Sequence, residues 1–109
     1  MTTPSVVDEI DNTVQALRRE LHLRGFTSRL SHVVSVIGTI PDSPPERFTA
    51  DNMSRLRKLA EETVEAVESR IDSGGDANKV QQELAGTVYE IRRRMEAVEI
   101  WFRHFAHDP

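Results

Sequence analysis

Residues 53–105 read MSRLRKLAEETVEAVESRIDSGGDANKVQQELAGTVYEIRRRMEAVEIWFRHF, two runs of helical hydrophobic spacing on either side of a glycine pair. In the first run, apolar side chains recur every three or four residues at Met53, Leu56, Ala60, Val64, Val67 and Ile71. In the second, they recur at Val80, Leu84, Val88, Ile91, Met95, Val98, Phe102 and Phe105. This spacing predicts two amphipathic helices, over about 49–73 and from Asp76 to about Phe105. The short link at Gly74-Gly75 makes them antiparallel neighbours.

The first forty residues carry two more stripes of the same kind. One consists of Val7, Ile10, Val14, Leu17 and Leu21, and the other of Phe26, Leu30, Val33, Ile37 and Ile40. Gly25 lies between them, and we expect the first helix to bend or split near this glycine. The β-branched stretch within residues 30–40 also suits a strand, but one strand would have no partner, so a helix is favoured. Prolines at 41, 44 and 45 then end the helix.

These stripes predict an all-α fold, an up-down helical bundle of three long helices. The first helix is bent or split near Gly25, which gives three to four helices in a single domain over 1–109. The last helix, roughly 45 Å long, exceeds the roughly 35 Å of its partner, so its aromatic C-terminal end overhangs. That end and the wide apolar face at 30–40 predict a two-fold symmetric homodimer.

Composition narrows the classes of function. The chain of 109 residues has no cysteine, which excludes disulfide scaffolds, thiolate zinc sites and cysteine nucleophiles. Because its net charge is −4, the chain lacks the long-range attraction to phosphate on which nucleic-acid binding depends, so we expect no nucleic-acid partner. The acidic start, with Asp8 and Glu9, does not suit a signal peptide, and no window is apolar enough for a membrane span. We therefore expect a soluble, cytoplasmic protein.

Acidic residues concentrate in the middle of the chain. Residues 41–76 hold nine acidic and five basic side chains, so the whole net charge lies there. Glu62 and Glu65, three residues apart, could hold Mg²⁺ together through their carboxylates. LAEETVEAVESRI followed by QQELAGTVYEI resembles the all-α nucleoside triphosphate pyrophosphohydrolases of the MazG-like class.

The resemblance implies a Mg²⁺ site formed by Glu62, Glu65 and Glu83. The family has a fourth carboxylate where this chain has Gly86, which implies weak metal binding and an inactive enzyme. The alternative interpretation, which we favour, is a solvated acidic face without a cofactor.

A second resemblance concerns His32. Phe26, Leu30, Ser31 and His32 are spaced as in the phosphoacceptor helix of histidine-kinase dimerisation domains, and residues 69–74 resemble the end of their second helix. The resemblance implies a histidine phosphotransfer-like hairpin with His32 as acceptor. Val33 stands where that family has an acidic residue. The alternative, which we favour, is a polar residue at a seam between helices.

The sequence favours a non-enzymatic regulatory or adaptor protein that binds another protein through its helical surface. The predicted contact residues are those at the aromatic end, Trp101, Phe102, Arg103 and Phe105, because Trp and Arg dominate binding energy at interfaces. Successive helix residues point about 100° apart, so residues 92–94, all arginine, form no single basic patch. We expect them to form helical ion pairs, Glu90 with Arg94 and Arg92 with Glu96.

Overall fold

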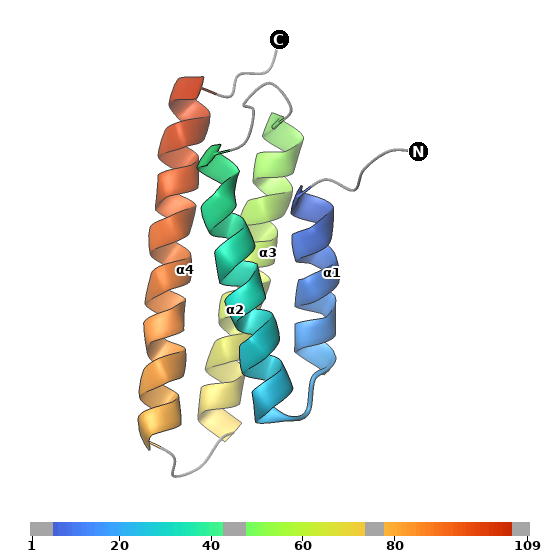
Figure 1. Cartoon of the computed structure of the whole chain (residues 1–109), viewed down its shortest axis with the longest axis vertical. Coiled ribbons are helices and arrows are strands. Elements are labelled where there is room, and N and C mark those ends of the chain that lie inside the picture. The colour runs from blue at the N-terminus through green and yellow to red at the C-terminus, as the bar shows by residue number, and fades with distance from the viewer. Residues whose placement is uncertain (1–5, 43–47, 74–77, 106–109) are drawn as a thin grey trace.

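The protein is a bundle of four α-helices. The computed structural model describes residues 6–42, 48–73 and 78–105, and this part of the chain contains no strand. The helices are α1 (Val6–Arg19), α2 (Leu23–Thr39), α3 (Ala50–Ser73) and α4 (Asn78–Phe105), with a 3₁₀ turn, η1 (Ile40–Asp42), after α2. The bundle measures 50 × 30 × 18 Å (Figure 1). The predicted all-α class is confirmed, including the helix predicted over residues 30–40.

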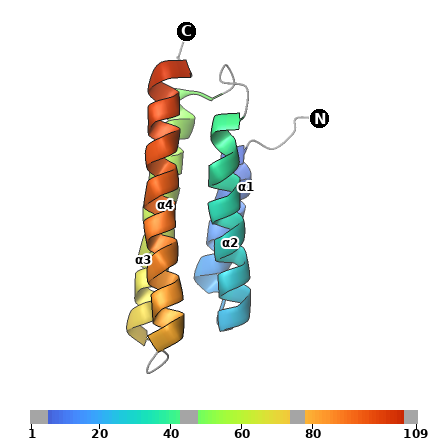
Figure 2. The same cartoon turned by 60° about the vertical axis from the view of Figure 1, so that its left-hand side comes forward.

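Two antiparallel hairpins form the bundle. The hairpin α1–α2 lies beside the hairpin α3–α4, as the second view shows (Figure 2). Helix α1 contacts α2 and α3, and α4 contacts α2 and α3. Helices α2 and α3 are consecutive in the sequence, yet they occupy opposite corners of the bundle. Gly74, Gly75, Asp76, Pro44 and Pro45, which were predicted to lie in connections or at a cap, fall outside the described residues.

The first helix splits near Gly25, as predicted, and the break lies at residues 20–22. Helix α1 ends at Arg19, and α2 begins after His22, whose extended backbone starts the new helix with a bond from the Phe26 amide to the His22 carbonyl. Gly25 lies inside the first turn of α2. Its missing side chain leaves room for the Glu20 carboxylate, which packs directly against it. Gly25 is therefore helical itself, and it contributes to the corner by leaving space for Glu20.

An arginine from α3 stabilises this corner. The Arg70 guanidinium donates hydrogen bonds to the carbonyls of Glu20 and Leu21 and lies 4.6 Å from the centre of the Phe26 ring. Carbonyls after the last turn of a helix have no partner within that helix, so a side chain from elsewhere satisfies them. Arg70 thereby ties the α1–α2 corner to α3.

The predicted stripes form the core with a few exceptions. The buried side chains of α1 are Val7, Ile10, Val14 and Leu17, and all five residues of the second stripe are buried. Leu21 is 85% exposed, because α1 ends before the stripe reaches it. The buried hydroxyl of Thr63 donates to the Leu59 carbonyl, at 2.7 Å. Stripe residues that face the outside of the α3–α4 pair, among them Val64 and Met95, are only half-buried.

None of the described helices combines the length and the apolar character needed to cross a membrane.

Candidate functional site

The surface between α3 and α4 is hollowed along its outer side. We call this the α3–α4 groove; its volume is about 450 Å³. Its apolar floor consists of Ala60, Val64, Ile91 and Met95, and its charged rim of Arg57, Glu61, Glu65, Arg92, Glu96 and Glu99. The stripes of two antiparallel helices meet at this seam, with the hairpin α1–α2 on the opposite side (Figure 2). Ala60 and Ile91 are buried in the core that α3 and α4 share with α1 and α2, whereas Val64 and Met95 are half-buried.

The rim of the groove is negatively charged. Both of its arginines are paired: Arg57 lies 2.6 Å from Glu99 across the seam, and Arg92 lies 4.0 Å from Glu68. The predicted pair between Arg92 and Glu96 is therefore wrong, because Arg92 turns toward α3. Glu61, Glu65 and Glu96 form no hydrogen bond or ion pair with another described residue. Three unpaired carboxylates thus surround an apolar floor.

The three glutamates of the MazG-like resemblance do not form a cluster. Glu62 turns toward α1, where its Oε1 accepts a hydrogen bond from Arg18 at 2.9 Å. Glu65 lies on the groove rim, and Glu83 is exposed near the start of α4. Within residues 6–42, 48–73 and 78–105, no three Asp, Glu or His side chains are grouped as metal ligands would be. The structure does not bring Glu62, Glu65 and Glu83 together.

The aromatic C-terminal end divides into a buried part and an exposed part. Trp101 is only 8% exposed, and its ring packs edge-on against Phe48 with 5.4 Å between centroids. Phe102 is half-buried and contacts Phe48 in the same way, at 6.0 Å. Arg103 and Phe105 point into solvent, Phe105 with 64% of its surface exposed. Of the four predicted contact residues, only these two are freely accessible, and the prediction that they bind a partner stays a prediction.

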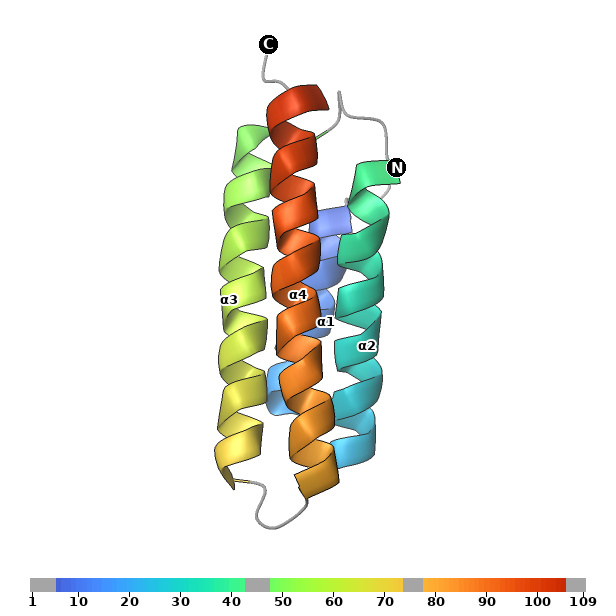
Figure 3. The ribbon, with the colours of Figure 1, turned by 90° about the vertical axis from the view of Figure 1, so that its left-hand side faces the viewer.

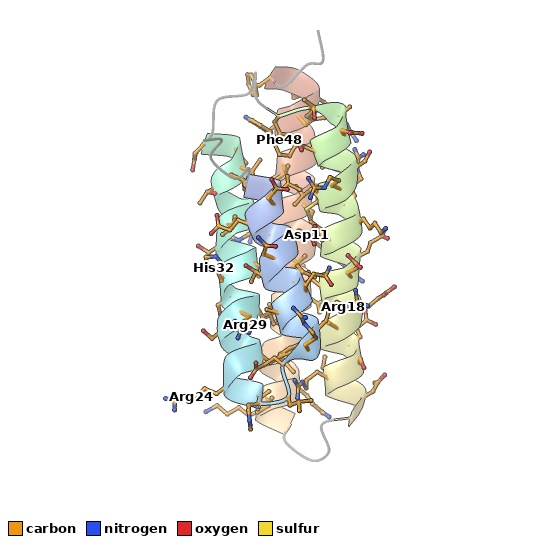
Figure 4. The ribbon with its side chains drawn as sticks, turned by 90° about the vertical axis from the view of Figure 1, so that its right-hand side faces the viewer. Asp11, Arg18, Arg24, Arg29, His32 and Phe48 are labelled. Atoms are coloured by element: carbon orange, nitrogen blue, oxygen red, sulfur yellow. The ribbon has the colours of Figure 1, made fainter. Side chains whose placement is uncertain are left out.

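Phe48 is a buried residue at the aromatic end that the sequence analysis missed. It follows the proline-rich connection and lies at this end of the bundle (Figure 4), where it packs against Trp101 and Phe102, so the chain itself covers this part of α4. The signal was a single large apolar residue just before the predicted start of α3, outside every stripe.

His32 lies at the seam between α1 and α2, as the favoured interpretation predicted (Figure 4). Its Nε2 is 3.0 Å from Oε1 of Glu9, and both side chains are about half exposed. The ring nitrogen that points toward α1 is therefore engaged with a carboxylate.

Other ion pairs join α1 to α3. Arg55 contacts Asp8 at 3.0 Å and Asp11 at 3.4 Å, and the hydrogen bond to Asp8 raises the pKa of this guanidinium above its already high ordinary value. Within α4, the predicted pair of Glu90 with Arg94 is confirmed, at 2.9 Å. Each of these carboxylates has an arginine partner, in contrast to Glu61, Glu65 and Glu96 on the groove rim.

Comparisons with known protein families, with curated proteins and with solved structures find no match for this chain.

Proposed function

We propose that this protein is a non-enzymatic regulatory or adaptor protein that binds a helical segment of another protein in the α3–α4 groove. The observation that carries the proposal is the hollow between α3 and α4, where Val64 and Met95 are half-buried above the buried side chains of Ala60 and Ile91. A hollow between two helices with half-buried apolar side chains at its base accepts a third amphipathic helix in the same way that bundle helices pack on one another.

The charges on the rim support a basic partner. Glu61, Glu65 and Glu96 are unpaired, whereas the rim arginines are neutralised by Glu68 and Glu99. A partner helix with an apolar stripe flanked by Lys or Arg would bury the floor and pair these carboxylates. The same field disfavours nucleic acid, whose phosphates would be repelled.

The test is a comparison of charge reversals inside and outside the groove. The tagged chain is used to isolate bound proteins from the source cells, together with the double variant Glu61→Lys/Glu65→Lys. The control, Asp72→Lys/Glu83→Lys, changes the net charge equally at two exposed positions outside the groove rim. Because the positions are exposed, both variants should fold as the parent does.

We expect a stoichiometric partner on the parent chain and on the control, and none on the groove variant. The cytoplasmic location is part of the same proposal, and fractionation of the source cells tests it. Equal recovery of the partner with both variants would move the binding site away from the groove.

A further inference from the structure

The outer face of α4 carries a second row of side chains, separate from the core stripe. Tyr89, Arg93, Glu96 and Ile100 follow one another at spacings of four, three and four residues. At 100° per residue they lie within a sector of about 60° on the helix. Tyr89 is 68% exposed and Ile100 48%, and Arg93 and Glu96 are exposed as well. We call these four residues the outer stripe of α4.

No other described element covers this stripe. Seen from its own side, α4 lies in front, with α3 and α2 on either side of it (Figure 3). Arg93 forms no hydrogen bond or ion pair with another residue that the structure describes, and neither does Glu96. The outer stripe of α4 therefore exposes two large apolar side chains, Tyr89 and Ile100, together with two opposite charges that have no partner among the described residues.

The stripe is complementary to itself in one register. We propose that two copies of this chain associate through the outer stripes of α4, antiparallel, about a two-fold axis between residues 94 and 95. In this register Tyr89 faces the partner subunit's Ile100, and Arg93 faces the partner subunit's Glu96. The two-fold axis repeats both contacts, as a symmetric interface requires.

The helical pattern supports the same register. Spacings of four and three are those of core positions in a coiled coil, and in an antiparallel pair each such position packs beside its counterpart of the other kind. Charges that pair in only one register specify the register and the orientation. A parallel pair would instead place Arg93 beside Arg93 and Glu96 beside Glu96, which like-charge repulsion disfavours.

The chemistry of the stripe favours a second copy over a foreign helix. Its charges sum to zero, so it does not select a basic or an acidic partner, in contrast to the groove rim. One pair of helices forms a small interface of the kind found in transient complexes, so we expect a dimer only at micromolar concentrations and above. The inference goes beyond the proposed groove function and does not depend on it.

Charge reversal tests the register. Sedimentation equilibrium would be run on the parent chain, Arg93→Glu, Glu96→Arg, and the double variant Arg93→Glu/Glu96→Arg. Each single reversal creates two like-charge contacts and should weaken dimerisation roughly tenfold or more, whereas the double variant restores both pairs and should recover the parent affinity. Arg24→Glu, at an exposed position on α2, is the matched control and should leave the affinity unchanged.

Cross-linking tests the orientation. The chain has no cysteine, so the double variant Tyr89→Cys/Ile100→Cys carries the only thiols. Eleven residues of helix separate them by roughly 16 Å, which prevents a disulfide within one chain. We expect oxidation to give a covalent dimer with this variant, and not with Tyr89→Cys alone or with the register-shifted pair Gln82→Cys/Ile100→Cys.

Three results would overturn the inference. They are a parent chain that stays monomeric at millimolar concentration, a double charge reversal that does not recover dimerisation, and a disulfide dimer with Tyr89→Cys alone. Glu96 belongs to both surfaces, so the groove is tested only at Glu61 and Glu65. A dimer that is lost in Glu61→Lys/Glu65→Lys would place the second copy in the groove, and the inference would also fail.

Discussion

At the scale of single residues, Arg70 joins α3 to the corner between α1 and α2. It contributes two hydrogen bonds to carbonyls of the α1–α2 corner and a cation–π contact with Phe26. We predict that Arg70→Ala lowers the free energy of unfolding by about 1–3 kcal/mol, because charged hydrogen bonds are lost and two carbonyls keep only water. Urea denaturation measures the change.

The variant Arg70→Lys is the informative control. It keeps the charge but loses the planar fork that reaches both carbonyls, so its stability should lie between those of the parent and Arg70→Ala. Stability equal to the parent in both variants would show that the corner does not depend on this residue.

Trp101 and Phe105 should respond to truncation in opposite ways. Trp101 is buried against Phe48, so we predict that Trp101→Ala lowers the free energy of unfolding by about 3–5 kcal/mol. Phe105 is 64% exposed, and Phe105→Ala should change stability by less than about 0.5 kcal/mol. Thermal unfolding of the two variants checks this. Unchanged stability of Trp101→Ala would contradict the burial of Trp101 and would support the surface contact role that the sequence alone predicted.

At the scale of the elements, Thr49 determines where α3 begins. Its hydroxyl accepts a hydrogen bond from the Asn52 amide at 3.2 Å, and its carbonyl accepts one from Met53 at 3.0 Å. This is the geometry of an N-cap. We predict that Thr49→Ala costs about 1 kcal/mol and that Thr49→Ser costs much less. Equal loss in both variants, measured by denaturant unfolding, would contradict a role for the hydroxyl.

The helices were predictable from the sequence because their stripes are long and regular. The run from Phe26 to Ile40 was assigned correctly despite its β-branched residues, since burial on one helical face outweighs local propensity. The break between α1 and α2 was predicted near Gly25 and lies at residues 20–22, where Arg70, a residue about fifty positions away, contacts the corner. No local pattern contains that contact.

The candidate site was less predictable than the helices. Val64 and Met95 belong to regular stripes, and spacing does not show that one side of a stripe stays uncovered. The outer side of the α3–α4 pair is open because the hairpin α1–α2 packs on the inner side of that pair. This arrangement is a tertiary property. Charge pairing is likewise a tertiary property, as Arg92 shows by binding Glu68 in place of Glu96.

At the scale of the whole molecule, we predict a binding protein without a metal-dependent reaction. Millimolar Mg²⁺ with a nucleoside triphosphate should leave Tm unchanged, because a ligand raises Tm only when it binds the folded state. Glu62→Gln and Glu83→Gln should likewise show no metal-dependent difference from the parent. A ligand-dependent rise in Tm that both substitutions abolish would support the pyrophosphohydrolase resemblance instead.

The most direct test of the α3–α4 groove is photo-cross-linking in the source cells. A photoreactive amino acid would replace Glu61 on the rim in one variant and Ser35, exposed on α2 outside this groove, in another. We predict one defined adduct with another protein at position 61 and none at position 35. Absence of an adduct at position 61, or the same adducts at both positions, would contradict the groove as the binding site.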